Sequence, residues 1–199
     1  MLVFVRQGLV LLATPKTAST ALQLALARHA DIVTRGLPAV KHISYPKYLR
    51  QVAPLVDGFV RGPVEVCALV RAPLDWLGSW YRFRQRDDIP DAEKGTAGMG
   101  FDDFVRDYLA DPRPPHADVG SQARFLTVPD QGLAVDRLFA YERIDRFVAF
   151  LEDRLDCEII LPKLNVSPLA SMELSAGTRA RHRDAATADY ALWEGLAHG

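Results

Sequence analysis

The sequence predicts an α/β fold, a single three-layer domain over residues 1–199 with a mainly parallel central sheet. Continuous apolar runs at residues 9–13 and 64–70 are typical of strands that are buried on both faces. Each run ends in a short polar turn and leads into an amphipathic helical pattern. Strands that alternate with helices in this way form parallel sheets covered by helices.

The first half of the chain divides into strands and helices at clear turn signals. Two short strands flank a turn at Gln7-Gly8, and Thr17 or Ser19 is suited to cap the helix that follows the second strand. Pro46 and Pro73 lie near the starts of two later helices, where proline is well suited to the first turn. The expected order is a helix at 19–28, extended segments at 31–34 and 39–43, a helix at 45–56, a strand at 64–70 and a helix at 74–86.

The second half continues this alternation after a polar loop at 87–100, which is rich in Gly, Asp and Pro. Apolar residues recur at helical spacing along residues 143–155, as expected for a helix with one buried face. The expected order is a helix at 101–109, a helix at 119–126, a strand at 137–141, a helix at 143–155, a strand at 159–161 and helices at 174–183 and 185–196.

Composition and charge exclude several classes of function. The 24 basic and 25 acidic side chains leave a formal net charge of −1, so we expect no nucleic-acid partner, and an anion site must be built locally. No stretch approaches the ~18 apolar residues of a membrane span, and Arg6 and Gln7 interrupt the apolar N-terminal stretch. The two cysteines show no metal or disulfide spacing, which favours a cytoplasmic protein.

A polar hexapeptide, Pro15-Lys16-Thr17-Ala18-Ser19-Thr20, lies between the first buried run and the first helix. The N–H groups at a helix start are unpaired, and the helix dipole adds positive potential there. Small residues let a phosphate or sulfate approach this backbone, while Lys16 adds a charge and three hydroxyls add donors. The hexapeptide lacks the glycines of a Walker A loop, so we expect anion transfer that requires no metal. A capped turn with a solvated lysine is the alternative.

Arg71 follows the second buried run, and Ser79 lies about two helical turns further on. A guanidinium at a strand end can hold a phosphate through two hydrogen bonds. Ligands of α/β sheets bind beyond the carboxyl ends of the strands, so we expect residues 15–20 and Arg71 at the same edge. Taken alone, an arginine at a strand end followed by a serine is more often structural.

Together the two segments resemble the sulfotransferase family that uses 3′-phosphoadenosine 5′-phosphosulfate (PAPS). Members carry a Pro-Lys-Thr-Gly-Ser/Thr-Thr-type loop, which binds the 5′-phosphosulfate, and an Arg followed eight residues later by Ser, which bind the 3′-phosphate. Residues 15–20 match the loop, and Arg71 with Ser79 match the second pair. Residues 138–145 and 161–167 are similar with less specificity, and Gln122 with Phe125-Leu126 favours the carbohydrate-type branch.

The resemblance implies a P-loop NTPase-like sulfotransferase fold, PAPS as donor and 3′-phosphoadenosine 5′-phosphate (PAP) as product. It implies that Lys16 stabilises the bridging oxygen as the S–O bond breaks. Two positions depart from the family pattern. Ala18 replaces a glycine, which is costly if the position needs a positive φ, and Ala72 replaces an aspartate.

The sequence also offers candidates for the general base that would take the proton from the acceptor hydroxyl. His42 is the first candidate, because the family uses a His or a carboxylate at a broadly similar place and imidazole suits proton abstraction near pH 7. His116 is a second candidate, and His29, His182 and His198 are expected on the surface. A surface or capping role for His42 stays open.

Two other functions stay open at this point. A small-molecule kinase of the P-loop class shares the strand–loop–helix arrangement, although it needs a Walker glycine loop. A non-catalytic relative that binds a nucleotide is the other, since Ala18 and the short chain depart from the family. The acceptor is expected to be a small molecule or carbohydrate, with a preference for carbohydrate-like hydroxyls; the oligomeric state stays open.

Overall fold

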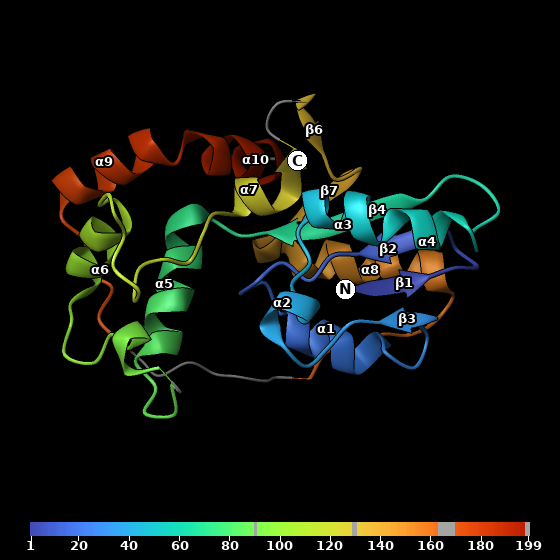
Figure 1. The fold of residues 1–199 in the computed structure, drawn as a ribbon, viewed down its shortest axis with the longest axis horizontal. Coiled ribbons are helices and arrows are strands. Elements are labelled where there is room, and N and C mark those ends of the chain that lie inside the picture. The colour runs from blue at the N-terminus through green and yellow to red at the C-terminus, as the bar shows by residue number, and fades with distance from the viewer. Residues whose placement is uncertain (90, 129–130, 163–169, 198–199) are drawn as a thin grey trace.

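A five-stranded sheet with the strand order β3-β1-β2-β4-β7 forms the centre of the chain (Figure 1). The computed structural model describes residues 1–89, 91–128, 131–162 and 170–197. The strands of the sheet are β1 (Leu2–Phe4), β2 (Leu9–Leu11), β3 (Ile32–Val33), β4 (Glu65–Val70) and β7 (Arg137–Ala140). The chain is thus an α/β fold, as predicted.

The expectation of a mainly parallel sheet is wrong, because the sheet is mixed. β1 pairs antiparallel with both β2 and β3, whereas β2–β4 and β4–β7 are parallel. The reason is the tight turn at Gly8, whose N–H donates to the Val5 carbonyl at 3.2 Å and whose φ is +56°. Such a turn can only join antiparallel neighbours, since parallel strands need a long crossover.

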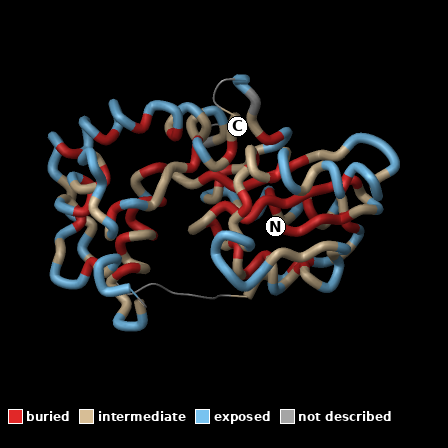
Figure 2. Tube along the Cα trace, viewed as in Figure 1, coloured by how far each residue is buried: buried red, intermediate tan, exposed pale blue. Residues whose placement is uncertain are grey.

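Helices cover both faces of this sheet, which confirms the three layers. Alternate strand residues such as Val10 and Val66 pack against α3 (Tyr45–Gln51), α4 (Ala53–Asp57), α7 (Gln122–Leu126) and α10 (Thr187–Ala197). The intervening residues, such as Leu9 and Cys67, pack against α1 (Ser19–Leu26) and α8 (Ile144–Leu155). Figure 2 shows the strands as the most buried part of the trace.

A second group of helices lies beside the sheet and has its own apolar cluster. It comprises α5 (Pro73–Arg84), α6 (Phe101–Tyr108) and α9 (Ala176–Ala185), on the left of Figure 1. Trp76, Leu77 and Tyr81 of α5 pack against Phe101 and other aromatic and aliphatic residues of α6. We call this group the helical lobe. It places α5 at the side of the loop that follows β2.

Several shorter elements differ from the expected ones. Residues 39–43 are not extended; α2 (Pro38–Lys41) is a helical turn with Pro38 at its start. The helix expected at 45–56 is two helices, α3 and α4, and residues 119–121 precede α7 rather than belong to it. Residues 159–161 form no strand, since the Ile159 N–H donates to the Glu152 carboxylate. The remaining elements are β5 (Thr127–Val128), β6 (Leu133–Ala134), η1 (Ala92–Lys94) and η3 (Tyr141–Arg143).

The family-like stretch at 161–167 extends into residues 163–169, which lie outside the described residues, so most of that resemblance has no structural counterpart here. His198 also lies outside them. Across the described ranges, none of the helices combines the length and apolar character needed to cross a bilayer.

Candidate functional site

The two polar segments predicted from the sequence meet at one edge of the sheet. β2 and β4 are parallel neighbours, so their carboxyl ends lie side by side. The Arg71 guanidinium, just after β4, donates from Nη1 to the Lys16 carbonyl at 3.3 Å. Trp76 of α5 donates from its indole N–H to the Pro15 carbonyl at 3.0 Å. The loop after β2 is therefore tied to both the end of β4 and the helix that follows it.

The backbone of this loop is shaped for close approach by an anion. Lys16 and Ala18 both adopt left-handed conformations, with φ values of 66° and 58°. Ala18 is the N-cap of α1, and no side chain caps this helix start. The first N–H groups of α1 have no acceptor within the helix and carry the positive end of its dipole. This is the backbone arrangement that binds phosphate and sulfate in many proteins.

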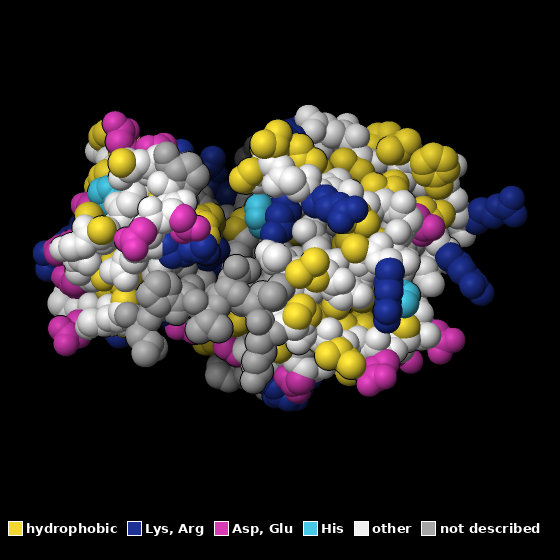
Figure 3. Space-filling view, turned by 90° about the horizontal axis from the view of Figure 1, so that it is seen from below, with side chains coloured by type: hydrophobic (Ala, Val, Ile, Leu, Met, Phe, Trp, Pro, Cys, Tyr) yellow, Lys and Arg dark blue, Asp and Glu magenta, His cyan; other side chains and the backbone are white. Residues whose placement is uncertain are grey.

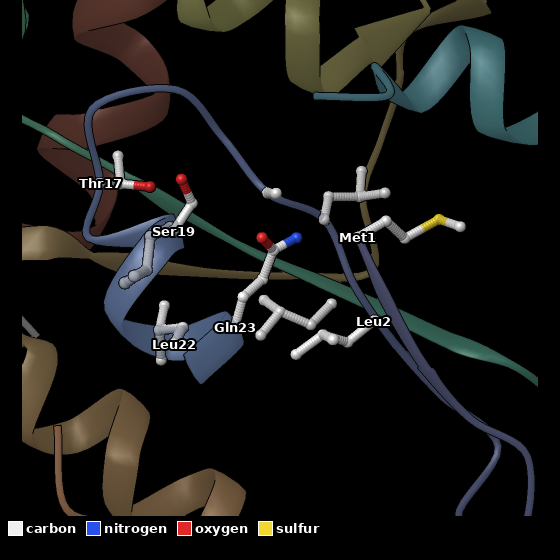
Figure 4. A pocket seen from close by; sticks show the side chains of 10 residues that line it. Met1, Leu2, Thr17, Ser19, Leu22 and Gln23 are labelled. Carbon is white, nitrogen blue, oxygen red and sulfur yellow. The ribbon is translucent and has the colours of Figure 1, made fainter. Parts of the chain in front are cut away.

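The hydroxyls of the loop do not all face a ligand, contrary to the expectation that three of them would hold the 5′-phosphate. Thr17 is buried and its hydroxyl donates to the Thr14 carbonyl at 3.0 Å. Ser19 is buried as well, and both residues line a cavity of about 10 Å³ together with Gln23 (Figure 4). The Thr20 hydroxyl accepts from Lys41 Nζ at 2.7 Å. An anion would thus be held chiefly by backbone N–H groups.

Lys16 turns its side chain toward the helical lobe. Its ammonium lies 3.7 Å from the centre of the Phe83 ring and 5.1 Å from that of Trp80. Burial, which has the largest effect, and four neighbouring cations, in the order Arg71, Arg86, Arg84 and Arg82, together lower the pKa of Lys16 to about 7. These four named charges are all positive, so a bound anion would stabilise the protonated form of Lys16.

The Arg71 side chain has a buried donor without a partner. Only 13% of the side chain is exposed, and its Nε finds no acceptor among the described residues. The guanidinium lies over the Tyr141 ring at 4.6 Å, and its Nη2 is 3.8 Å from the exposed Asp75 carboxylate. A buried donor left unpaired costs about 1–3 kcal/mol. A phosphate oxygen at this position would supply the missing acceptor.

Ser79 lies where the sequence predicts, on α5 and on its buried side. Residues three and four apart share a helix face, so Ser79 lies on the face of Trp76 and Phe83, which contact the Pro15 carbonyl and the Lys16 ammonium. Within the described ranges the Ser79 hydroxyl makes no hydrogen bond to protein. Ser79 is therefore close to the loop and has a free hydroxyl.

Two residues that the sequence analysis did not connect with Arg71 fix the backbone around it. Gln122, which is 1% exposed, accepts from the Arg71 N–H at 2.8 Å and donates to the Arg71 carbonyl at 2.7 Å. Glu142 accepts from the Ala72 N–H at 2.8 Å and from the Trp193 indole at 3.0 Å. The family resemblance pointed to Gln122 and Glu142, but neither was predicted to position Arg71.

Replacement of Gln122 by alanine is expected to lower the free energy of unfolding by about 2–3 kcal/mol, because the Arg71 N–H and carbonyl lose their partners in a buried place. Denaturant unfolding measures this effect. Gln51→Ala, at an exposed position on α3, is the matched control and should change stability by less than about 0.5 kcal/mol. Equal effects of the two substitutions would contradict the role given to Gln122.

Because Ala18 is in a left-handed conformation, one substitution at this position is expected to raise the free energy of unfolding rather than lower it. A residue with a Cβ pays roughly 1 kcal/mol in this conformation, and glycine does not. We expect Ala18→Gly to raise the free energy of unfolding, by up to about 1 kcal/mol. Ala27→Gly, at a right-handed position with φ −57°, should instead lower it. Thermal or denaturant unfolding of both variants tests this pair of predictions. A loss of stability in Ala18→Gly would contradict the cost given to the left-handed conformation of Ala18.

His42 lies beside the start of the same loop, where it contacts Ala13, shortly before Pro15. Its Nδ1 is 2.6 Å from the Ala13 carbonyl. Since a carbonyl only accepts, Nδ1 carries a proton, and Nε2 is the unprotonated nitrogen of the neutral ring. Burial lowers the pKa of His42, partly offset by the Ala13 hydrogen bond. The neutral ring therefore dominates at pH 7, which is the form a general base needs.

His116 and His182 do not join the site. His116 pairs through Nε2 with Asp107 at 2.7 Å, and its carbonyl accepts from Arg84, so it holds the helical lobe together. His182 was expected on the surface, but it is buried between Tyr108 and Tyr190, and burial lowers its pKa to about 4. Its aromatic neighbours come from α6 and α10, a contact that local sequence does not reveal.

A scan of known protein families gave no match for this chain, and a search among curated proteins found no significant relative. The site must therefore be interpreted from its own geometry. Figure 3 shows the surface hollowed between the helical lobe and the sheet, with basic side chains and a histidine along the hollow. One side of the site offers a helix N-terminus with Lys16, and the other offers Arg71 with Ser79. This arrangement suits a ligand with two separate anionic groups.

Proposed function

We propose that the protein is a sulfotransferase that moves a sulfuryl group from PAPS to an acceptor hydroxyl and releases PAP and a sulfate ester. The observation that carries the proposal is the contact between Arg71 Nη1 and the Lys16 carbonyl. It brings together two places that can each hold a phosphate. PAPS has one phosphate on the 3′-oxygen and a phosphosulfate on the 5′-oxygen of the same adenosine.

The described residues fit such a ligand in three respects. The start of α1 lacks a side-chain cap, so its N–H groups are free for the 5′-phosphate. The buried Nε of Arg71 lacks an acceptor in the part of the chain that the structure describes, and the 3′-phosphate would supply one. Ser79 is buried on α5, and its hydroxyl makes no hydrogen bond to the described residues, so it is available for the same phosphate. PAPS itself supplies an activated sulfuryl group on a phosphate leaving group.

In the proposed reaction the acceptor oxygen forms a bond to sulfur while the bond between sulfur and the bridging phosphate oxygen breaks, and the electron pair of that bond stays on the phosphate. Lys16 and the α1 N–H groups stabilise the negative charge that develops there, which is the form of catalysis with the largest effect in most enzymes. His42 Nε2 takes the proton of the acceptor hydroxyl.

His42→Ala is expected to lower turnover by about 100-fold or more, which is the usual contribution of a general base. The pKa of His42 is lowered from 6.5, so the wild-type rate should fall only as the pH drops below that value and the ring becomes protonated. The variant should lose this acid limb. His29→Ala, at an exposed position in the turn that follows α1, is the control. A variant profile that keeps the acid limb would remove His42 from the reaction.

A thermal-shift assay separates the proposal from a kinase. PAP without added metal should stabilise the protein, by about 2.7 kcal/mol at 100 times its Kd, and incubation with PAPS and an acceptor should yield PAP. A kinase would instead be stabilised by ATP with Mg²⁺. Stabilisation by ATP with Mg²⁺ and none by PAP would contradict the sulfotransferase proposal; PAP binding with no transfer to any acceptor would favour a non-catalytic relative.

A further inference from the structure

A second cavity opens on the other side of the loop that carries Lys16. It has a volume of about 260 Å³. Thr14 and Pro15 form one wall and Trp76 of α5 another; residues 119–121, which lead into α7, form a third with Gln122, Arg124 and Phe125 of that helix. Ser44 closes it toward α3. An apolar cavity of about 150 Å³ already holds a benzene molecule, so this one is large enough for a single substituted ring.

Three residues that line the cavity are close in sequence to the two groups that the proposed reaction uses. Thr14 and Pro15 directly precede Lys16, and Ser44 follows His42 by two residues. His42 is anchored on Ala13, which directly precedes Thr14. An acceptor in this cavity would thus lie beside both the base and the lysine, as rapid reaction between bound groups requires.

The chemistry of the walls selects among acceptors. Trp76, Phe125 and Val119 present apolar surface. Arg124 also lines the cavity, is exposed, and has no carboxylate partner among the described residues. Ser121 accepts from the Arg124 N–H at 3.2 Å, which holds this residue at the start of α7. The cavity therefore combines apolar walls with one unpaired cation.

We infer that the cavity between α5 and α7 binds the acceptor and takes a single-ring compound that bears a hydroxyl and a carboxylate. The ring packs against Trp76 and Phe125, and the carboxylate pairs with Arg124 through charge-assisted hydrogen bonds. The role of this molecule as sulfuryl acceptor rests on the proposed function, whereas its binding can be measured without any reaction.

Fluorine NMR titration of the full chain tests the inference with two probes, 3-fluoro-4-hydroxybenzoate and its uncharged amide. The benzoate is expected to bind at least tenfold more tightly than the amide. Arg124→Gln should bring the two affinities within about threefold, because it removes the cation that pairs with the carboxylate. Ser44→Phe should fill the cavity and weaken both probes. Arg50→Gln, which changes an exposed arginine of α3 outside the cavity, should leave the preference unchanged.

Equal affinities of the two probes in the wild type would overturn the inference, and so would a preference that survives Arg124→Gln or no binding of either probe. The proposed function is judged separately, by titration of the same variants with PAP. Arg124→Gln should bind PAP as the wild type does. If the wild type does not bind PAP, the sulfotransferase proposal is contradicted. The measured preference for the carboxylate would still hold.

Discussion

Replacement of Lys16 by methionine is expected to lower the turnover of sulfuryl transfer by more than tenfold while the fold survives. Methionine keeps the apolar contact with Phe83 and Trp80 but removes the charge that stabilises the leaving phosphate. Turnover is measured with PAPS at saturation, so that weaker binding does not enter the result. Lys47→Met, on α3 away from the loop, is the control, and near-normal turnover in Lys16→Met would remove Lys16 from the mechanism.

The same substitution should change how stability depends on pH. Burial lowers the pKa of Lys16 from 10.5 to about 7, so between these values the unfolded chain binds more protons than the folded one. The contribution of Lys16 to the free energy of unfolding therefore rises with pH in this window. The methionine variant lacks this rise. Its stability relative to the wild type should be highest below pH 7 and should decline toward pH 10; a difference that is constant over this range would contradict the burial of Lys16.

Replacement of Arg71 by alanine is expected to weaken PAP binding by about 100-fold, or about 2.7 kcal/mol, because a buried guanidinium makes strong paired hydrogen bonds to phosphate. AMP, which lacks the 3′-phosphate, should bind equally to the wild type and the variant. The ratio of PAP to AMP affinity, measured by calorimetry, thus isolates the contact with the 3′-phosphate.

Two further variants sharpen this result. Arg71→Lys should recover only part of the PAP affinity, because an ammonium cannot form the paired hydrogen bonds of a guanidinium. Arg181→Ala, on the exposed side of α9, should have no effect on either nucleotide. A PAP-to-AMP ratio that is unchanged in Arg71→Ala would show that Arg71 does not hold the 3′-phosphate.

The elements next to the site could be predicted from the sequence because their signals are local. β2 and β4 are short apolar runs that end in polar turns, and α1 and α5 follow directly. The parallel pairing of β2 with β4 then follows from the rule that such units form parallel sheets. The hairpin at Gly8 also has a local signal, and it makes the sheet mixed, because β1, which lies between β3 and β2, runs opposite to the other four strands.

Other parts of the site depend on contacts between residues far apart in the chain. Gln122 and Glu142 hold the Arg71 turn from positions 51 and 70 residues away, and no spacing rule predicts such pairs. The burial of the Thr17 and Ser19 hydroxyls depends on how the loop turns at Lys16 and Ala18. A count of hydroxyls in the sequence could not show that two of them face the interior.

The most direct test of the account is a crystal structure of the protein with PAP. The account predicts one PAP molecule with its 5′-phosphate on the N–H groups at the start of α1 and its 3′-phosphate on Arg71 and Ser79. PAP bound elsewhere on the surface, or bound with only one phosphate at this edge of the sheet, would contradict it.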